Sequence, residues 1–424
     1  MNDTIFALSS GSPPAAIAVV RISGPCADTA LEALAGKLPP PRRATLVNLR
    51  RRDEPLDRAL VLRFPGPHSA TGEDVAELHL HGGRAVVAAV LEALAGLDGL
   101  RPAEPGEFTR RAFDNGRIDL AEAEGLADLL GAETQSQRRA ALAMAGGALS
   151  RKVEAWRHRL LALAAALEAA LDFSDEGEVG EDWPPGWADE LDALVGEMEA
   201  LLARPPTERL RDGVRIVIAG PPNAGKSSLL NTLAQREAAI TSAVPGTTRD
   251  LIEAPVSIAG TPYLLIDTAG LRDSVDEVET IGVERARASV AGADLILWLG
   301  EPADAPDPQR TIRVQSKCDL ESAADPAADV RVSAVTGEGV EALVSALAER
   351  SRALLPAEGE VGANARQREA VANAVAHLRP ARAADMLIAA EGLRQARIEL
   401  DRITGRAGVE DMLDALFGRF CIGK

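Results

Sequence analysis

The sequence is poor in cysteine and has no long hydrophobic run. The three cysteines in 424 residues, Cys26, Cys318 and Cys421, are too few and too scattered for a disulfide framework or a zinc site. No stretch of roughly 18 or more apolar residues occurs, so we expect no membrane span. The opening MNDTIFALSSGSPP lacks the basic region and the long apolar core of a secretory signal. We therefore expect a reduced, cytoplasmic protein.

Positive charge is also scarce. The chain has 64 acidic residues against 46 lysines and arginines, a formal net charge of -18. An acidic chain repels phosphate backbones at long range, which disfavours tight non-specific nucleic-acid binding by this chain alone. One helical region does gather basic residues, and we favour a solvated helix face over an RNA-binding patch for this group: Arg138, Arg139, Arg151, Lys152, Arg157 and Arg159.

Lysine is rare although arginine is abundant. Lysine occurs only at positions 37, 152, 226, 317 and 424. A compact ammonium and a planar guanidinium are not interchangeable at tight sites. The scarcity therefore draws attention to Lys226, Lys317 and Lys424.

The pattern of residues 1–116 predicts an α+β domain. Residues 16–23, 58–64 and 74–81 alternate or run apolar and predict strands. Residues 85–96 predict a helix that ends at a glycine.

The remaining sequence predicts a helical domain interrupted by an α/β unit. Residues 117–211 and 353–424 are helical in pattern, and each carries an apolar stripe, from Leu191 to Leu202 and from Val409 to Phe420. Residues 212–352 alternate strand and helix, which favours a mostly parallel sheet with helices on both faces. We infer that the α/β unit is an insertion and that the two helical halves pack together.

A phosphate-binding loop lies at the start of the α/β unit. GPPNAGKS (220–227) fits G-x-x-x-x-G-K-[ST] directly after a predicted strand. Gly220 and Gly225 let backbone amides turn toward phosphates, Lys226 neutralises the β- and γ-oxygens, and Ser227 supplies a Mg²⁺ ligand.

The later motifs follow in the order of a guanine-nucleotide switch. PGTTRD (245–250) offers Thr248 as a second Mg²⁺ ligand, and DTAG (267–270) offers an aspartate for Mg²⁺-bound water and a glycine amide for the γ-phosphate. In SKCD (316–319), Asp319 accepts the two N–H donors of guanine, and Lys317 lies along the base. SAVTG (333–337) fits the loop that contacts guanine O6.

This set resembles the translation-factor-like GTPases, whose base-reading motif is N-K-x-D. Ser316 replaces the asparagine. A shorter side chain is expected to brace the phosphate loop less well, so we expect reduced guanine affinity with specificity retained through Asp319.

The residue that orients water for hydrolysis is missing from its usual place. Leu271 follows D-T-A-G, where Ras-type enzymes carry a glutamine. A monovalent cation held by Asn223, by carbonyls near Ser242 and Val244, and by Thr247 is our alternative. Glu279 either aligns the water or is an exposed acid at a helix start.

The predicted nucleotide-binding residues combine these motifs. They are Asn223, Ala224, Gly225, Lys226, Ser227, Ser228, Ser242, Ala243, Val244, Pro245, Gly246, Thr247, Thr248, Asp267, Thr268, Ala269, Gly270, Ser316, Lys317, Asp319, Ser333 and Ala334.

Over nearly its whole length the chain resembles one family, the tRNA modification GTPases MnmE, also called TrmE. The resemblance rests on long motifs: FPGPHSATGEDVAELHLHGG (64–83), PGEFTRRAFDNGRIDLAEAEGLADLL (105–130), GPPNAGKSSLLNTL (220–233), REAAITSAVPGTTRD (236–250), DTAGLR (267–272) and the terminal FCIGK.

The resemblance implies an N-terminal α+β folate-binding and dimerisation domain, a split all-α domain and an inserted Ras-like P-loop GTPase domain. It implies a homodimer whose GTPase domains pair across potassium ions. With the FAD- and NADH-using partner MnmG, in a heterotetramer, the family installs the 5-carboxymethylaminomethyl or aminomethyl group on wobble uridine 34 of certain tRNAs. The one-carbon unit comes from 5-formyl- or 5,10-methylene-tetrahydrofolate, and GTP hydrolysis drives the conformational cycle.

The resemblance also implies residue roles. The K⁺ ligands fall on Asn223, Ser242, Val244 and Thr247, and the Mg²⁺ ligands on Ser227 and Thr248. Glu279 falls on the family's water-orienting acid. The folate contacts fall on Arg21, Glu77, Arg117 and Lys424, in keeping with a carboxylate for the pterin edge and cations for the glutamate tail.

The terminal CIGK is expected to be a tail placed in the N-terminal domain, with Lys424 near the folate site. Gly423 and Lys424 do not fit a C-a-a-X lipidation box. Cys421 is either a catalytic nucleophile toward uridine C6 or a small residue lining a pocket, and the second reading is favoured.

Two other functions stay open at this point. A ribosome-assembly GTPase is compatible with the phosphate loop, although such proteins usually carry a basic RNA-binding appendage that is not visible in this sequence. A dimeric switch scaffold without a folate role is the other.

Overall fold

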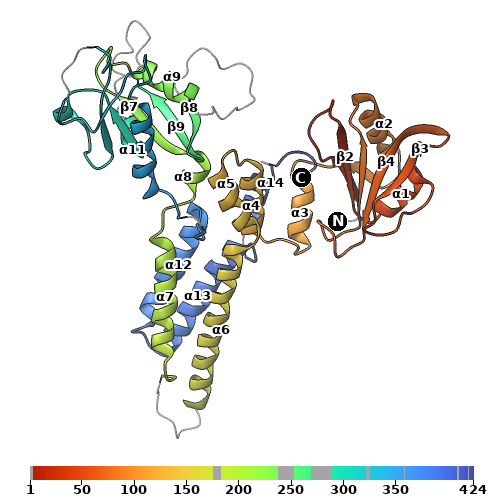
Figure 1. Ribbon diagram of the computed structural model, residues 1–424. Coiled ribbons are helices and arrows are strands. Elements are labelled where there is room, and N and C mark those ends of the chain that lie inside the picture. Colours follow the sequence, from red (N-terminus) through yellow and green to blue (C-terminus); the bar gives the residue numbers. More distant parts are fainter. Residues whose placement is uncertain are drawn as a thin grey trace, which may run out of the picture. The chain divides into compact units, whose positions relative to one another are not determined.

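The computed structural model of the chain describes residues 3–174, 183–236, 253–268, 288–320, 325–357, 359–407, 410–418 and 420–424. It divides into two compact units, Met1–Ala127 with Asp401–Lys424, and Asp128–Leu400. Figure 1 shows the helices and strands of both units with their labels. The domain boundaries expected from the sequence pattern stay a prediction.

The first unit is built on a six-stranded sheet in the order β3-β4-β5-β2-β1-β6. Neighbouring strands are antiparallel except β1 and β6, which are parallel. The predicted strands are confirmed as β2, β4 and β5, whereas the other three were not recognised. The strands are β1 (Thr4–Leu8), β2 (Ile17–Ser23), β3 (Thr45–Arg51), β4 (Glu54–Phe64), β5 (Val75–His81) and β6 (Leu100–Pro102).

Two helices, α1 (Ala27–Ala35) and α2 (Arg84–Ala95), cover one face of this sheet. Val20, Ile22 and Leu78 point into the core beneath them and are fully buried. Because side chains alternate along a strand, Arg21, Glu77 and His79 lie on the opposite face. The alternation in β2 and β5 thus separates a hydrophobic core from a polar surface.

The chain's last helix belongs to the same unit. Helix α14 (Glu410–Phe417) contributes Leu413 and Phe417 to a cluster with Phe113 of α3 (Glu107–Asp114) and Leu120 of α4 (Leu120–Leu130). Phe420, just beyond α14, is buried in the same cluster. The described part of the predicted stripe, from Leu413 to Phe420, therefore packs against α3 and α4.

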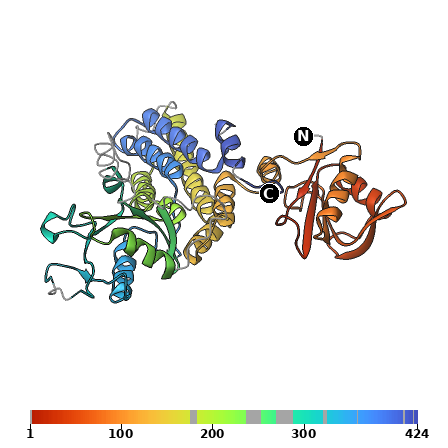
Figure 2. The ribbon, with the colours of Figure 1, turned by 90° about the horizontal axis from the view of Figure 1, so that it is seen from above.

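The helices of the second unit include the two halves that flank the α/β sheet. Helix α7, before the sheet, packs against α6 and against α12, which follows the sheet. Arg368 of α12 donates to the carbonyls of Leu202 (2.6 Å) and Arg204 (2.9 Å). The predicted packing of the two halves is confirmed, and Figures 1 and 2 show the helices side by side. They are α5 (Gln135–Ala145), α6 (Ala148–Ser174), α7 (Trp187–Leu202), α8 (Glu208–Asp212), α12 (Ala365–Ala381) and α13 (Met386–Thr404).

The second sheet has the order β12-β11-β10-β7-β9-β8. All neighbours are parallel except the edge hairpin β8–β9. Helices α9 (Lys226–Arg236) and α11 (Val340–Arg352) contribute to the core on one face. The strands are β7 (Val214–Ala219), β8 (Glu253–Ile258), β9 (Thr261–Asp267), β10 (Leu295–Trp298), β11 (Thr311–Gln315) and β12 (Val330–Arg331).

The connection from β10 to β11 differs from the expected alternation of strand and α-helix. In the described chain it contains only a 3-10 turn, η1 (Pro302–Asp304). β7 is buried at nearly every position, as in a strand covered on both faces, whereas β11 alternates buried and half-buried residues. Its half-buried positions are polar, Arg313 and Gln315, which fits a partly exposed face.

Across the described ranges, no helix is both long and apolar enough to cross a membrane.

Candidate functional site

The phosphate loop joins the end of β7 at Ala219 to the start of α9 at Lys226. Gly220 and Gly225 have φ angles of 148° and 92°, a region that favours glycine. Asn223 has a φ of 60°, which asparagine tolerates better than most residues. Backbone amides at the N-terminus of a helix attract anions. The loop therefore has the backbone required to hold phosphates.

Lys226 is folded over this loop. Its side chain is buried, and Nζ donates to the carbonyls of Gly220 (3.2 Å) and Pro221 (2.9 Å). The loop's own carbonyls thus place the ammonium beside the amides that would receive phosphate oxygens. A cation in that position suits the β- and γ-phosphates of a nucleotide.

The structure brings together two predicted contributors to a Mg²⁺ site. The Ser227 hydroxyl donates to the carboxylate of Asp267, which is buried at the end of β9. Thr268, the next residue, donates its hydroxyl to the Ile218 carbonyl of β7 (3.0 Å), which fixes the strand end. A hydroxyl and a carboxylate are hard oxygen donors of the kind Mg²⁺ prefers, so this pair fits the ion.

Ser316 braces the phosphate loop, which corrects the expectation from its short side chain. Its hydroxyl donates to the Ala224 carbonyl at 2.7 Å. Lys317, with a φ of 58°, donates Nζ to the neighbouring Asn223 carbonyl, also at 2.7 Å. The two loops lie close enough that a serine spans the gap. The expected loss of the brace is therefore wrong.

The second base loop, residues 333–337, which is predicted to contact guanine O6, is hydrogen-bonded to α9. Ser333 is fully buried, and its hydroxyl accepts from the amides of Val335 (3.2 Å) and Thr336 (3.1 Å). The Ala334 carbonyl accepts from Thr232 of α9 at 3.1 Å. Asp319 is exposed at the end of the first base loop. The phosphate loop and both base loops thus meet at one edge of the sheet.

Several predicted site residues lie outside the described residues. They are Ser242, Ala243, Val244, Pro245, Gly246, Thr247, Thr248, Ala269, Gly270 and Glu279. Their predicted roles in binding K⁺, Mg²⁺ and water stay predictions. Asn223 is the one predicted K⁺ ligand within the described ranges.

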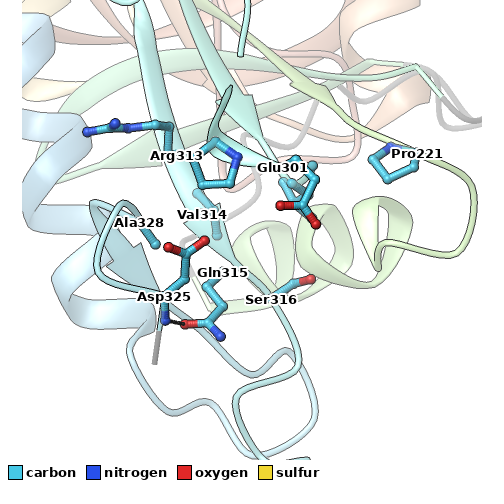
Figure 3. Close-up of a pocket in the computed structure, with 11 residues that line it drawn as sticks. Pro221, Glu301, Arg313, Val314, Gln315, Ser316, Asp325 and Ala328 are labelled. Carbon is cyan, nitrogen blue, oxygen red and sulfur yellow. Dashed lines mark hydrogen bonds between the residues drawn. The ribbon is translucent and has the colours of Figure 1, made fainter. Parts of the chain in front are cut away.

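A cavity of about 300 Å³ lies beside these loops, at the carboxyl ends of β10 and β11 (Figure 3). It is lined by Pro221 and Ser316, by residues that follow β10, and by Asp325, whose amide donates to the Gln315 side chain (3.0 Å). Of the described residues predicted to bind nucleotide, only Ser316 lines it. The cavity therefore adjoins the nucleotide site and does not coincide with it.

In the first unit, the structure pairs two of the predicted folate residues. Arg21 of β2 and Glu77 of β5 are opposite each other in the sheet. Both Nε and Nη2 of Arg21 donate to Glu77 Oε1, at 3.0 and 2.9 Å. Arg21 also lies 5.7 Å from the centre of the Phe108 ring, a cation–π contact that the sequence did not indicate.

The C-terminal tail is placed against the same sheet, as expected. Ile422 forms a β-bridge with Pro105. Gly423 has a φ of 95°, and a Cβ there would lie 2.2 Å from the Leu8 carbonyl oxygen, so only glycine fits without rearrangement. Leu8 pairs with Val20, the neighbour of Arg21. The tail thus packs against β1, which is next to β2 in the sheet, and half-buried Lys424 is at its tip; the predicted place of Lys424 near the folate site stays a prediction.

Two other residues singled out for this region, Arg117 and Cys421, have no contact with the pair among the described interactions. Arg117 packs beside Gly72, where an added Cβ would lie 3.2 Å from its Cγ, and no described contact joins it to Glu77. Cys421 is a free, exposed thiol in the tail. Its two readings therefore both remain predictions.

A buried ionic network that the sequence did not indicate supports this region. Arg111 is 1% exposed and donates to Asp3 (2.9 Å), Glu107 (3.0 Å) and Glu73 (3.1 Å). Burial acts to raise the pKa of Glu107, but hydrogen bonds from Arg101, from the Glu104 amide and from Arg111 outweigh it and lower the pKa. Glu107 and Arg111 are a local i,i+4 pair, but Asp3 and Glu73 are too far from Arg111 in sequence for a local pattern to have revealed the network.

Two family profiles together match almost the whole chain. The profile described as GTP-binding protein TrmE N-terminus matches residues 4–117, and the MnmE helical domain matches residues 120–421. The second match encloses the parallel sheet, in keeping with an inserted α/β unit.

Curated relatives match over the full length. The tRNA modification GTPase MnmE of Rhizorhabdus wittichii is 59% identical, covering 100% of this chain and 97% of the relative. The tRNA modification GTPase MnmE of Erythrobacter litoralis is 58% identical, covering 100% of both. That of Novosphingobium aromaticivorans is 56% identical, again covering 100% of both.

Solved structures resemble only part of the chain. The G domain of the T. maritima FeoB iron transporter is 25% identical and covers 32% of this chain and 98% of that chain, with a TM-score of 0.23. So low a score adds nothing to the assignment, which rests on the profiles and the full-length relatives. On those grounds the chain belongs to the MnmE family of tRNA modification GTPases and is a GTP hydrolase.

Proposed function

We propose that the chain is a potassium-activated, homodimerising GTPase of the cytoplasm. It works with the FAD-dependent partner MnmG to install the 5-carboxymethylaminomethyl or aminomethyl group on wobble uridine 34 of certain tRNAs. A tetrahydrofolate supplies the one-carbon unit, and GTP hydrolysis drives the conformational cycle. The coarse activity, GTP hydrolysis in tRNA modification, follows from the family, and the finer statements are the proposal.

One observation carries the nucleotide part of the proposal. In the first base loop, residues 316–319, Ser316 and Lys317 donate hydrogen bonds to the carbonyls of Ala224 and Asn223 in the phosphate loop. A nucleotide whose phosphates lie on the α9 N-terminus would then have its base beside Asp319. This arrangement supports guanine recognition, and the Ser227–Asp267 pair supports Mg²⁺ at the phosphates.

Potassium activation rests on Asn223 and on the leucine at position 271. Leu271 has no group that orients water, so we propose that the cation supplies the positive charge that stabilises the transition state. The test is steady-state GTP hydrolysis by the full chain in potassium and in sodium at equal ionic strength. Faster turnover in potassium is expected, and equal turnover contradicts the cation mechanism.

The folate part of the proposal rests on the Arg21–Glu77 pair and on the tail that packs against the same sheet. A pterin presents adjacent N–H donors that suit a carboxylate, and the glutamate part of folate suits Arg117 and Lys424. We expect 5-formyl-tetrahydrofolate to bind the full chain and Glu77→Ala to bind at least tenfold more weakly. Absence of binding to the wild type would favour a switch scaffold.

An exposed apolar strip supports the homodimer. Ile17, Leu46 and Leu60 are 59, 55 and 38% exposed on the sheet face that carries Glu77. Leu46 and Leu60 are direct cross-strand partners, so their side chains form one patch. Large apolar side chains gathered on a sheet face favour an interface. Light scattering of the wild type and of Leu60→Glu tests it, with a shift toward monomer expected for the variant.

Mass spectrometry of wobble uridines from cells lacking this chain tests the overall function. Loss of the modified uridine supports the proposal, whereas intact uridines with a ribosome-assembly defect would favour an assembly GTPase. Cys421→Ser in the same assay distinguishes the two readings of the thiol. Intact modification would dismiss Cys421 as a nucleophile.

A further inference from the structure

Glu77 uses one of its two carboxylate oxygens for Arg21, and the other faces a histidine. Both Arg21 bonds end on Oε1. Oε2 lies 3.5 Å from Nε2 of His79. That nitrogen is shielded from solvent and has no hydrogen-bond partner among the described residues. Buried polar atoms are nearly always hydrogen-bonded, so an unpaired nitrogen beside a carboxylate marks a position that serves a purpose.

The strand places the two side chains on the same surface. His79 follows Glu77 by two residues on β5, so both project from one face of the sheet. In the sheet, His79 is flanked by Leu60 of β4 and Val19 of β2. The His79 and Glu77 side chains are 27 and 18% exposed, so a ligand can reach both from the open side.

We propose that His79 is a positioning residue for Glu77, a step that rests on the proposed folate function. Arg21 holds Oε1 and the Nε2–H of His79 holds Oε2, so that the plane of the carboxylate is fixed from both edges. A carboxylate fixed in this way presents its remaining lone pair, on Oε2, to an N–H donor of a pterin edge. A movement of about half an ångström brings the His79–Glu77 pair within hydrogen-bond distance.

Three substitutions separate positioning from simple packing. A glutamine amide nitrogen reaches roughly the place of Nε2, an asparagine amide reaches only that of Nδ1, and leucine fills space without a donor. In calorimetric titration of the full chain with 5-formyl-tetrahydrofolate, we expect His79→Gln to bind within twofold of the wild type. We expect His79→Asn and His79→Leu to bind at least tenfold more weakly. Far-UV circular dichroism and thermal unfolding, measured in parallel, check that each variant is folded.

Equal affinities for the glutamine, asparagine and leucine variants would overturn the proposal, because a packing role does not distinguish the position of a donor. A second measurement is independent of folate. ¹⁵N NMR of the imidazoles should show that the neutral His79 ring of the wild type carries its proton on Nε2. This tautomer preference should be lost in Glu77→Gln. If the wild type fails to bind folate, the folate function fails, and the NMR result alone supports or overturns the positioning role.

Discussion

Replacing Ser316 with alanine removes one hydrogen bond between the base loop and the phosphate loop. The lost bond is the 2.7 Å contact from the Ser316 hydroxyl to the Ala224 carbonyl. A single hydrogen bond of this kind contributes about 1 kcal/mol, which corresponds to roughly a fivefold change in affinity. Because Lys317 still holds the adjacent Asn223 carbonyl, we expect weakened nucleotide binding and not its loss.

The assay is equilibrium titration with a fluorescent GDP analogue in the presence of Mg²⁺. Ser316→Ala should bind about fivefold more weakly than the wild type, whereas Ser316→Asn should keep the brace and bind at least as tightly as the wild type. Ser345→Ala is the matched control, since its hydroxyl also donates to a carbonyl, Glu341 of α11 (2.9 Å), but on an exposed helix surface. We expect the control to bind as the wild type does.

The reasoning fails if Ser316→Ala and Ser345→Ala bind GDP equally well. That result would mean that the brace does not organise the phosphate loop for the nucleotide. Urea unfolding of both variants accompanies the titration, because a general loss of stability would imitate weaker binding.

Three further predictions follow from the same structure. Lys226→Ala, which removes the buried ammonium from the phosphate loop, should weaken GDP binding at least tenfold in the same titration. Glu107→Gln should lower the urea midpoint at pH 7. The folded-state pKa of Glu107 lies below its ordinary 4.5, so its carboxylate stabilises the fold above pH 4.5 and this stabilisation is lost as the pH falls through the lowered pKa. The urea midpoints of the wild type and of Glu107→Gln should therefore converge in acid. Gly423→Ala, whose Cβ would meet the Leu8 carbonyl, should weaken 5-formyl-tetrahydrofolate binding several-fold in calorimetry and leave GTP hydrolysis unchanged.

The phosphate loop was predictable because its chemistry is local. The glycines, Lys226 and Ser227 follow one another in sequence, and the turn from strand to helix that they require is a property of those few residues. The strands β2, β4 and β5 were predictable for a similar reason, since alternation of apolar and polar residues reports one buried face. Short β1 and β6 carry too few residues for such a pattern.

The consequence of Ser316 was not predictable from its side-chain length. Whether a serine spans the gap to Ala224 depends on how closely two loops approach that lie 92 residues apart in sequence. The structure puts them within one hydrogen bond. The 3-10 turn between β10 and β11 was missed because the sequence pattern predicted a regular alternation of strands and α-helices. That pattern does not show how short an individual connection is.

The sequence by itself determined the phosphate loop and the family, because both reside in contiguous motifs whose backbone and side-chain chemistry needs no distant partner. Only the tertiary structure decided which groups meet around Glu77 and Arg111. Arg21 and Glu77 are 56 residues apart, and Arg111 reaches Asp3 across 108 residues. Such pairs form where the sheet register and helix packing bring distant segments together, and no local pattern in the sequence records that distance.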